Sequence, residues 1–279
     1  MPIHDQGYRR YAGERSAHGR AWAVIASAGI RTMLRKRSFI GLLLLAGAPF
    51  FVRAVQIYAA ANLPQASFLA PTPEMFRDFL TQQSIFVFFI AVYAGSGLIA
   101  TDRRANALQI YLSKPLSRVE YVFGKLAVLL VFLLLVTWVP AIVLLLVQVM
   151  FAGDFTFFID NLFLFPAITL SAFIQAMTVA ATMLALSSLS KSSRYVAILY
   201  AGVIFFTQAM YGVLYQVTRD SSWAWLSFSA NLSQINAFIF RMRPSYDTPW
   251  PVSLAVLAAV VALSAVILER RVRGVEVVA

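Results

Sequence analysis

The chain has 279 residues, of which 60% are hydrophobic and 13% charged, and its mean hydropathy is +0.75. Soluble domains are usually about 45–50% apolar and about 25% charged, so this composition excludes an ordinary soluble enzyme. Cysteine is absent and both histidines, His4 and His18, precede the first apolar run, which excludes disulfides, thiolate metal sites and histidine chemistry within a membrane.

Residues 1–37 are polar at the start and amphipathic at the end. Apolar side chains recur at helical spacing from Trp22 to Leu34, while Arg31 and Arg35 fall on the other side. The pattern predicts a cytoplasmic tail followed by an interfacial amphipathic helix along the inner lipid headgroups, a level that suits the ring of Trp22. A cytoplasmic extension of the first span is the alternative.

Six apolar stretches are each long enough, to within a few residues, to cross about 30 Å of hydrocarbon as a helix. They are Ser38–Tyr58, Ser84–Ala100, Leu126–Met150, Phe163–Leu189, Tyr195–Val217 and Val252–Leu268. A transmembrane barrel is excluded because its strands would alternate polar and apolar residues. The predicted fold is an all-α membrane protein, with a six-helix transmembrane domain at residues 38–268 and a cytoplasmic C-terminal tail at residues 269–279.

The two longest connections between spans are predicted to lie outside the membrane. Asn62–Gln83 contains three prolines, so we expect a loop with one short helix near Glu74–Leu80. Arg219–Trp250 contains three tryptophans, which favour the membrane interface. We expect this second segment to form a small cap over the outer exit.

The net charge of +11 raises the question of nucleic-acid binding, which the placement of the charges answers. Eighteen of the 23 Lys and Arg residues lie on one side of the predicted spans and four on the other. Arg53 lies inside the first span, and we expect it to snorkel to the outer headgroups; a substrate or counter-ion contact is the alternative. This positive-inside asymmetry predicts cytoplasmic termini and explains the charge with no nucleic-acid partner.

Two nucleotide-binding motifs can be compared with the sequence. Gly95–Ala100 has the letters of a dinucleotide fingerprint, but it closes an apolar span where a strand should precede it, so we interpret its small residues as serving helix packing or a kink. The sequence contains no G-x-x-x-x-G-K-[ST] phosphate loop. If ATP drives this protein, the ATPase must therefore be a separate chain.

The connection between the second and third spans carries the most informative pattern. Asp102–Leu112 is predicted to form a short helix that presents Leu108, Tyr111 and Leu112 on one face, and Pro115 ends it. Ser117–Glu120 then has the pattern of a capping box that opens the third span. An apolar triplet on a basic cytoplasmic surface favours docking of a partner, and a solvated helical hairpin is the alternative.

The residues of this connection resemble the core signature of the ABC-2 type permeases. The likeness lies in Gly97–Asp102 and Leu108–Lys125, while Asn106-Ala107 departs from the family's usual glycine-threonine. The resemblance implies that Asp102 takes the usual glutamate position. It also implies that a coupling helix contacts the ATPase through Tyr111, Leu112, Ser113 and Pro115.

The resemblance implies the membrane subunit of an ATP-binding-cassette transporter, an exporter, in the bacterial cytoplasmic (inner) membrane. Two permease subunits, as a homodimer or heterodimer, would then work with ATPase subunits that bind ATP and Mg, while this chain carries no cofactor, metal or catalytic residue of its own. A non-transporting membrane scaffold is one alternative. An ion-driven secondary carrier is another, although buried acids at the bilayer midplane, which such carriers normally have, are missing from the sequence.

The resemblance also suggests a cargo path, because spans two and five line the dimer centre of similar permeases. In this sequence those spans carry aromatic and amide side chains at roughly helical spacing, namely Phe86, Phe89, Tyr93, Gln208, Tyr211 and Tyr215. The same residues could equally be core aromatics or face the membrane lipids. The cargo itself is not encoded in any motif.

Overall fold

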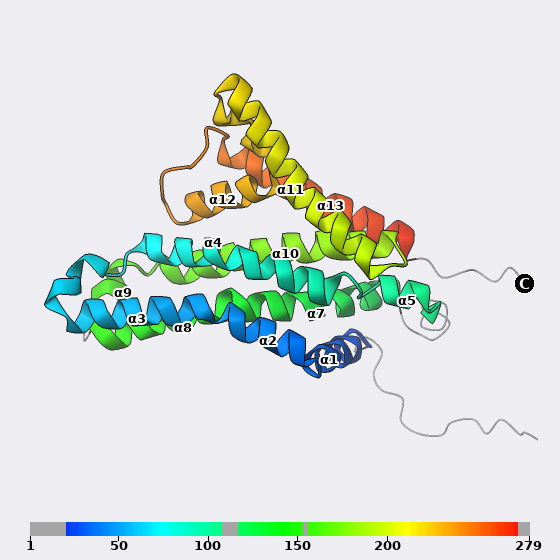
Figure 1. Cartoon of the computed structure of the whole chain (residues 1–279), viewed down its shortest axis with the longest axis horizontal. Coiled ribbons are helices and arrows are strands. Elements are labelled where there is room, and N and C mark those ends of the chain that lie inside the picture. The colour runs from blue at the N-terminus through cyan, green and yellow to red at the C-terminus, as the bar shows by residue number, and fades with distance from the viewer. Residues whose placement is uncertain (1–20, 108–116, 153–155, 273–279) are drawn as a thin grey trace, which may run out of the picture.

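The structure is a computed structural model that describes residues 21–107, 117–152 and 156–272. Every regular element in these ranges is helical, and six helices are long and apolar enough to cross a membrane. In Figure 1, α3, α4, α7, α8 and α10 run along the length of the molecule, while α11 leans away from them; α5 lies near one end, and α3 and α9 reach the other. The all-α fold with six candidate spans is therefore confirmed.

Three of the six spans are built from more than one helical segment. The first consists of α2 (Arg37–Ala46) and α3 (Ala48–Asn62). The second consists of α4 (Pro73–Ile90), η2 (Ala91–Gly95) and α5 (Ala100–Arg104). The third consists of α7 (Arg118–Val136) and α8 (Trp138–Ala152). The last three are single helices, α10 (Leu164–Leu189), α11 (Ser193–Thr218) and α13 (Trp250–Arg271).

Proline and its neighbours account for two of the interruptions. Gly47 separates α2 from α3, where Pro49 occupies the first turn of α3, and Thr137 separates α7 from α8 ahead of Pro140. Proline lacks the N–H of the helical ladder, and its ring clashes with the carbonyl four residues back. Pro166 sits instead in the first turn of α10, where no such bond is lost.

The second span begins earlier than the sequence predicted. α4 starts at Pro73 and continues without a break, so the expected short helix at Glu74–Leu80, separate from the span, is wrong. Pro73 and Glu74 favour a helix start, and Phe76 and Phe79 are fully buried against the bundle. Only η1 (Pro64–Leu69) and an extended stretch remain between the first two spans, and α9 (Thr156–Asp160) lies after α8.

α10 forms the centre of the bundle, while α11 lies at its edge. α10 packs against α4, α7, α8, α11, α12 and α13. A larger share of its residues is buried than in any other span. Along α11 the large side chains of Ile198, Phe205 and Phe206 are about two-thirds exposed. Such an apolar face is stable only in contact with lipid or with another membrane subunit.

The segment after α11 does not form the expected small cap over the outer exit. It contains η3 (Ser221–Leu226) and α12 (Phe228–Ile239), and α12 lies in the wedge between α11 and α10 (Figure 1). The backbone N–H of Phe228 donates to the hydroxyl of Thr207, 3.3 Å away. Thr207 lies three turns before the C-terminal end of α11, about 16 Å along its axis, so the segment folds back alongside the span.

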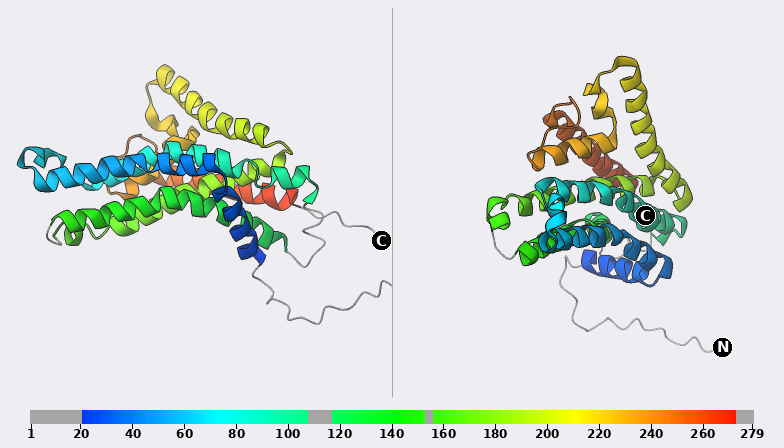
Figure 2. Two further views of the ribbon diagram at one scale, coloured as in Figure 1. Left: turned by 60° about the horizontal axis from the view of Figure 1, so that its bottom comes forward. Right: turned by 60° about the vertical axis from the view of Figure 1, so that its left-hand side comes forward.

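α1 (Ala21–Leu34) is a helix of its own, which rules out a straight extension of the first span. An extended residue, Lys36, separates it from α2, and Figure 2 shows α1 at a clear angle to the spans. It crosses α7 closely: a Cβ on Gly124 would lie 2.8 Å from Cβ of Ile25, and one on Gly29 would lie 2.6 Å from Val128. The two glycines thus allow α1 to pack against the N-terminal part of α7.

Candidate functional site

The second span is broken near the end that leads into the connection with the third. η2 is a π-helical turn, and four turn residues separate it from α5. Gly95 is needed here because a Cβ would lie 2.5 Å from Cγ of Met183 and 3.1 Å from the side chain of Leu129. The interpretation of this small-residue run as a packing and kink element is confirmed.

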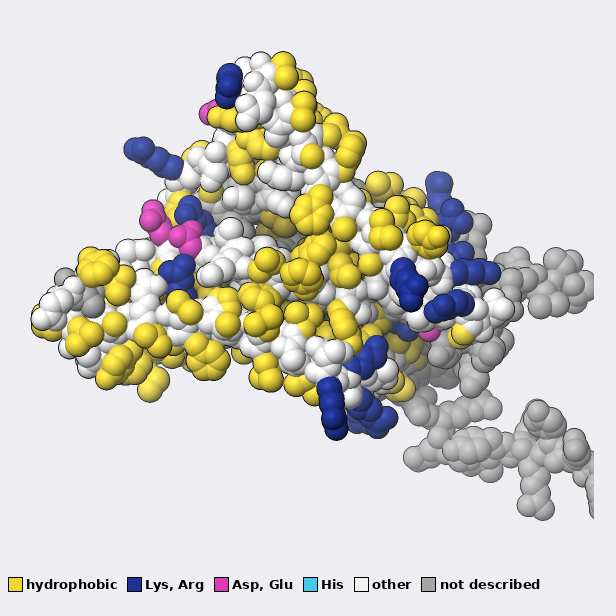
Figure 3. Space-filling model, in the orientation of Figure 1, with side chains coloured by type: hydrophobic (Ala, Val, Ile, Leu, Met, Phe, Trp, Pro, Cys, Tyr) yellow, Lys and Arg dark blue, Asp and Glu magenta, His cyan; other side chains and the backbone are white. Residues whose placement is uncertain are grey.

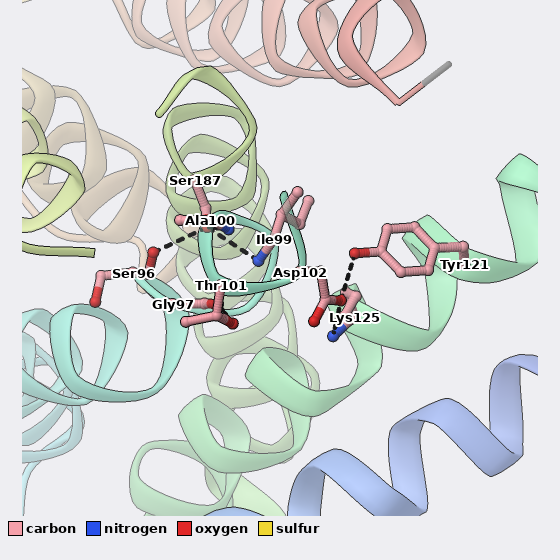
Figure 4. A network of polar contacts seen from close by, with 9 residues as sticks. All are labelled: Ser96, Gly97, Ile99, Ala100, Thr101, Asp102, Tyr121, Lys125 and Ser187. Atoms are coloured by element: carbon pink, nitrogen blue, oxygen red, sulfur yellow. Dashed lines mark hydrogen bonds and ion pairs between the residues drawn. The ribbon is translucent and has the colours of Figure 1, made fainter. Parts of the chain in front are cut away.

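One hydroxyl satisfies the backbone groups that the break exposes. Oγ of Ser187, on α10, accepts hydrogen bonds from the N–H groups of Ile99 and Ala100, each at 3.1 Å, and donates to the carbonyl of Ser96 at 2.9 Å (Figure 4). Ser187 is fully buried. Because a buried backbone group without a hydrogen-bond partner costs about 1–3 kcal/mol, this side chain permits the break inside the packed protein.

Asp102 joins the end of the second span to the third. Its carboxylate accepts a hydrogen bond from the Tyr121 hydroxyl at 2.7 Å and forms an ion pair with Lys125, also at 2.7 Å (Figure 4). Both charged side chains are only 16% exposed, so water screens the pair weakly. Next to Asp102, the Arg103 guanidinium donates to the carbonyl of Ser188 on α10. α5 is thus tied to two neighbouring spans.

The connection beyond α5 differs from the prediction at its start and agrees at its end. α5 ends at Arg104, and Asn106 has a left-handed φ of 51°, so the expected unbroken helix over Asp102–Leu112 is wrong. At the other end Ser117 and Glu120 form the predicted capping box, with bonds of 3.1 and 3.2 Å. Of the coupling residues, only Asp102 is described; the others lie outside the described residues, namely Leu108, Tyr111, Leu112, Ser113 and Pro115.

Residues 23–271 match the sequence profile of the ABC-2 family transporter proteins, which covers most of the chain. The chain belongs to the ABC-2 transporter family. No curated protein matches it. The resemblance seen in Gly97–Asp102 and Leu108–Lys125 is therefore confirmed.

Family membership states the class of function. An ABC-2 permease is a multi-pass membrane component of an ABC transporter and is not itself catalytic. Permeases of this family generally work with an ATPase subunit.

The suggested cargo residues on the second span lie on a partly exposed face. Phe89 and Tyr93 are 49% and 37% exposed, and Phe86 is half-buried. Tyr93 also has partners within the chain: its ring stacks on Phe39 at 5.4 Å, and its hydroxyl shares a 2.5 Å hydrogen bond with Ser38. Phe86 and Phe89 lie near the middle of the second span, which runs from Pro73 to Arg104.

The suggested cargo residues on the fifth span lie in the half of α11 that leads into η3. Gln208 accepts a hydrogen bond from Ser227 at 2.5 Å, which holds the start of α12. Tyr211 is buried in an aromatic group with Tyr215 and Tyr246. α4 meets α11 through Phe88, whose ring centre lies 5.5 Å from that of Tyr200 and 5.8 Å from that of Phe205. Among the described residues, no hydrogen bond or ring contact joins the suggested cargo side chains of one span to those of the other.

The polar joint formed by Asp102, Tyr121 and Lys125 was only partly predictable from the sequence. Tyr121 and Lys125 are letters of the family signature, but nothing in their spacing assigned them to Asp102. Ser187 was not singled out at all, and the only hint was a run of serines at the end of the fourth span. Among the described residues no group of three His, Cys, Asp or Glu side chains could hold a metal ion.

Proposed function

We propose that this ABC-2 permease is the membrane subunit of an exporter, driven by separate ATPase subunits that dock on its connection between the second and third spans. Those subunits would bind ATP and Mg. The observation that carries the proposal is the polar joint at Asp102, because it links the end of that connection to the third span by a short ion pair. A solvated hairpin would need no such joint.

One ion pair and two hydrogen bonds would transmit movement of the ATPase to the spans. A partner that pulls on the connection moves α5, and the break at η2 lets α5 tilt without bending α4. The Asp102–Lys125 pair then carries α7 along, while Ser187 keeps α5 attached to α10. Movement of one end of a packed helix as a rigid body is a common way to convert closure of a partner into a transport step.

The apolar side chains of Leu108, Tyr111 and Leu112 would supply the docking energy. Each large apolar side chain that is fully buried contributes roughly 1.5–3 kcal/mol. Asp102 faces α7 and Lys125, so we assign it to the joint behind the docking surface, from which it would act on the ATPase through α5.

The exposed apolar face of α11 supports an assembly of two permease subunits, a homodimer or a heterodimer, with cargo passing between them. The suggested cargo residues on the second and fifth spans would then be completed across that interface. The basic end of the bundle, prominent beside α1 and α5 in Figure 3, would face the cytoplasm and carry both termini. The membrane would be the inner membrane of a bacterium.

The proposal is tested by isolating the full chain, with an affinity tag, from membranes of its own host. We expect an ATP-hydrolysing subunit to copurify, and inside-out vesicles that contain both proteins to accumulate cargo only with ATP. A chain that copurifies with other membrane proteins but with no ATPase would favour the scaffold alternative. ATP-dependent depletion of cargo from inside-out vesicles would reverse the direction.

A further inference from the structure

A cavity of about 600 Å³ lies where α1 meets the ends of the second, third and fifth spans. Lys36 immediately precedes the first span, and Ser193 is the first residue of α11. Both residues line the cavity, together with Thr101 of α5 and Lys125 of α7. Because four spans end here, the cavity lies at the level of the lipid headgroups on the basic side of the protein.

The cavity has two chemically different walls. Its polar wall includes two lysines, the Asp102 carboxylate and the hydroxyls of serine, threonine and tyrosine. Its apolar wall comes from α1 and the broken second span, through Val24, Ile25, Ala28, Met33 and Leu98. A small hydrophilic ion would leave the second wall bare, whereas an amphipathic molecule would cover both.

The charges that line the cavity favour the binding of an anion. Lys125 is neutralised by Asp102, but Lys36 has no carboxylate within 4.0 Å among the described residues. The Lys36 ammonium lies 5.7 Å from the ring centre of Tyr93, a cation–π distance. Arg35 and Arg37 on either side add to the positive potential.

We infer that this cavity binds the headgroup phosphate of an anionic phospholipid from the inner leaflet, with Lys36 as its counter-charge. The apolar wall would receive the glycerol and the first methylenes of the acyl chains. A site of 600 Å³ is far larger than a phosphate ion needs, which favours the lipid over a soluble phosphate. The inference is independent of the ATPase, since it concerns lipid bound to this chain alone.

Native mass spectrometry of the full-length chain, titrated with phosphatidylglycerol and with phosphatidylcholine, tests the site. We expect preferential binding of phosphatidylglycerol. Lys36→Gln should weaken that binding roughly fivefold, which corresponds to about 1 kcal/mol, because it removes the counter-charge that lines the cavity. Ala28→Phe should weaken the binding as well, because the larger side chain fills the space beside the apolar wall without any change of charge.

Two controls separate the site from general attraction. Arg35→Gln removes the same charge one residue away, outside the cavity lining, and should leave the preference within twofold of wild type. Soluble glycerol phosphate in excess should not displace the lipid. Equal losses in Lys36→Gln and Arg35→Gln, or an unchanged preference in both Lys36→Gln and Ala28→Phe, would overturn the site. Displacement by glycerol phosphate would assign it to a soluble phosphate instead.

Discussion

At the scale of single residues, the hydroxyl of Ser187 is the group on which the broken second span depends. Ser187→Ala would leave the N–H groups of Ile99 and Ala100 without an acceptor in a buried site. We expect a loss of about 1–3 kcal/mol of unfolding free energy, the cost of unsatisfied buried polar groups. Unfolding in mixed detergent micelles measures it.

The same helix provides a matched control for this serine. Ser171 on α10 is also fully buried, but its hydroxyl has no hydrogen-bond partner among the described residues. Ser171→Ala should therefore be neutral or slightly stabilising. If the two alanine variants lost equal stability, the hydroxyl of Ser187 would not be the origin of the effect.

The polar joint at Asp102 makes a separate prediction. Asp102→Asn removes the charge opposite Lys125 while an oxygen for the Tyr121 hydroxyl remains. For a pair that is only partly shielded from water, we expect a loss on the order of 1–3 kcal/mol. Lys125→Met in the Asp102→Asn background should recover part of it, since no unpaired charge then remains.

A double-mutant cycle measures the coupling between Asp102 and Lys125. Its four proteins are the wild type, Asp102→Asn, Lys125→Met and the double variant. Additive losses would mean that the pair contributes nothing as a pair. The sequence alone could not make this assignment, because residues 102 and 125 are brought together only when the second and third spans pack side by side.

At the scale of whole helices, the packing of α1 on α7 can be tested by a designed disulfide. The chain has no cysteine of its own, and an ideal Cβ at Gly29 lies 3.7 Å from Cβ of Val128. This separation matches the usual Cβ–Cβ distance of about 3.8 Å in disulfides. Gly29→Cys with Val128→Cys should therefore lose both free thiols under mild oxidation.

Thiol counting by mass spectrometry after alkylation reads out this crosslink. Gly41→Cys with Val128→Cys serves as the control, because in the described part of the chain no other side chain lies within 4 Å of a Cβ at Gly41. Retention of both thiols in the Gly29 pair would show that α1 does not pack on α7 as described.

Helix-scale features differ in how well the sequence predicted them. The spans were found because each needs only a local run of apolar residues, and the Ser117–Glu120 cap because its partners are three residues apart. The break at η2 was anticipated from its small residues. The return of α12 toward Thr207 was not, because it depends on space left between α10 and α11, which no local pattern records.

At the scale of the whole molecule, the distribution of basic residues predicts which end faces the cytoplasm. Single cysteines at Gln65 and Ser245 should react with a membrane-impermeant maleimide in intact cells. Cysteines at Asn106 and Lys191 should react only after the membrane is opened. The opposite pattern at any of these sites would contradict the six-span arrangement with cytoplasmic termini.

The central claim is that an ATPase engages the connection between the second and third spans, and its most direct test is permease-dependent ATP hydrolysis. In the complex purified with its ATPase, Tyr111→Ala with Leu112→Asp should abolish ATPase association or the stimulation of hydrolysis by cargo. Tyr58→Ala with Leu63→Asp makes the same changes at exposed positions near the other end of the bundle and should leave both intact. Wild-type association and stimulation in the Tyr111 and Leu112 variant would contradict the account.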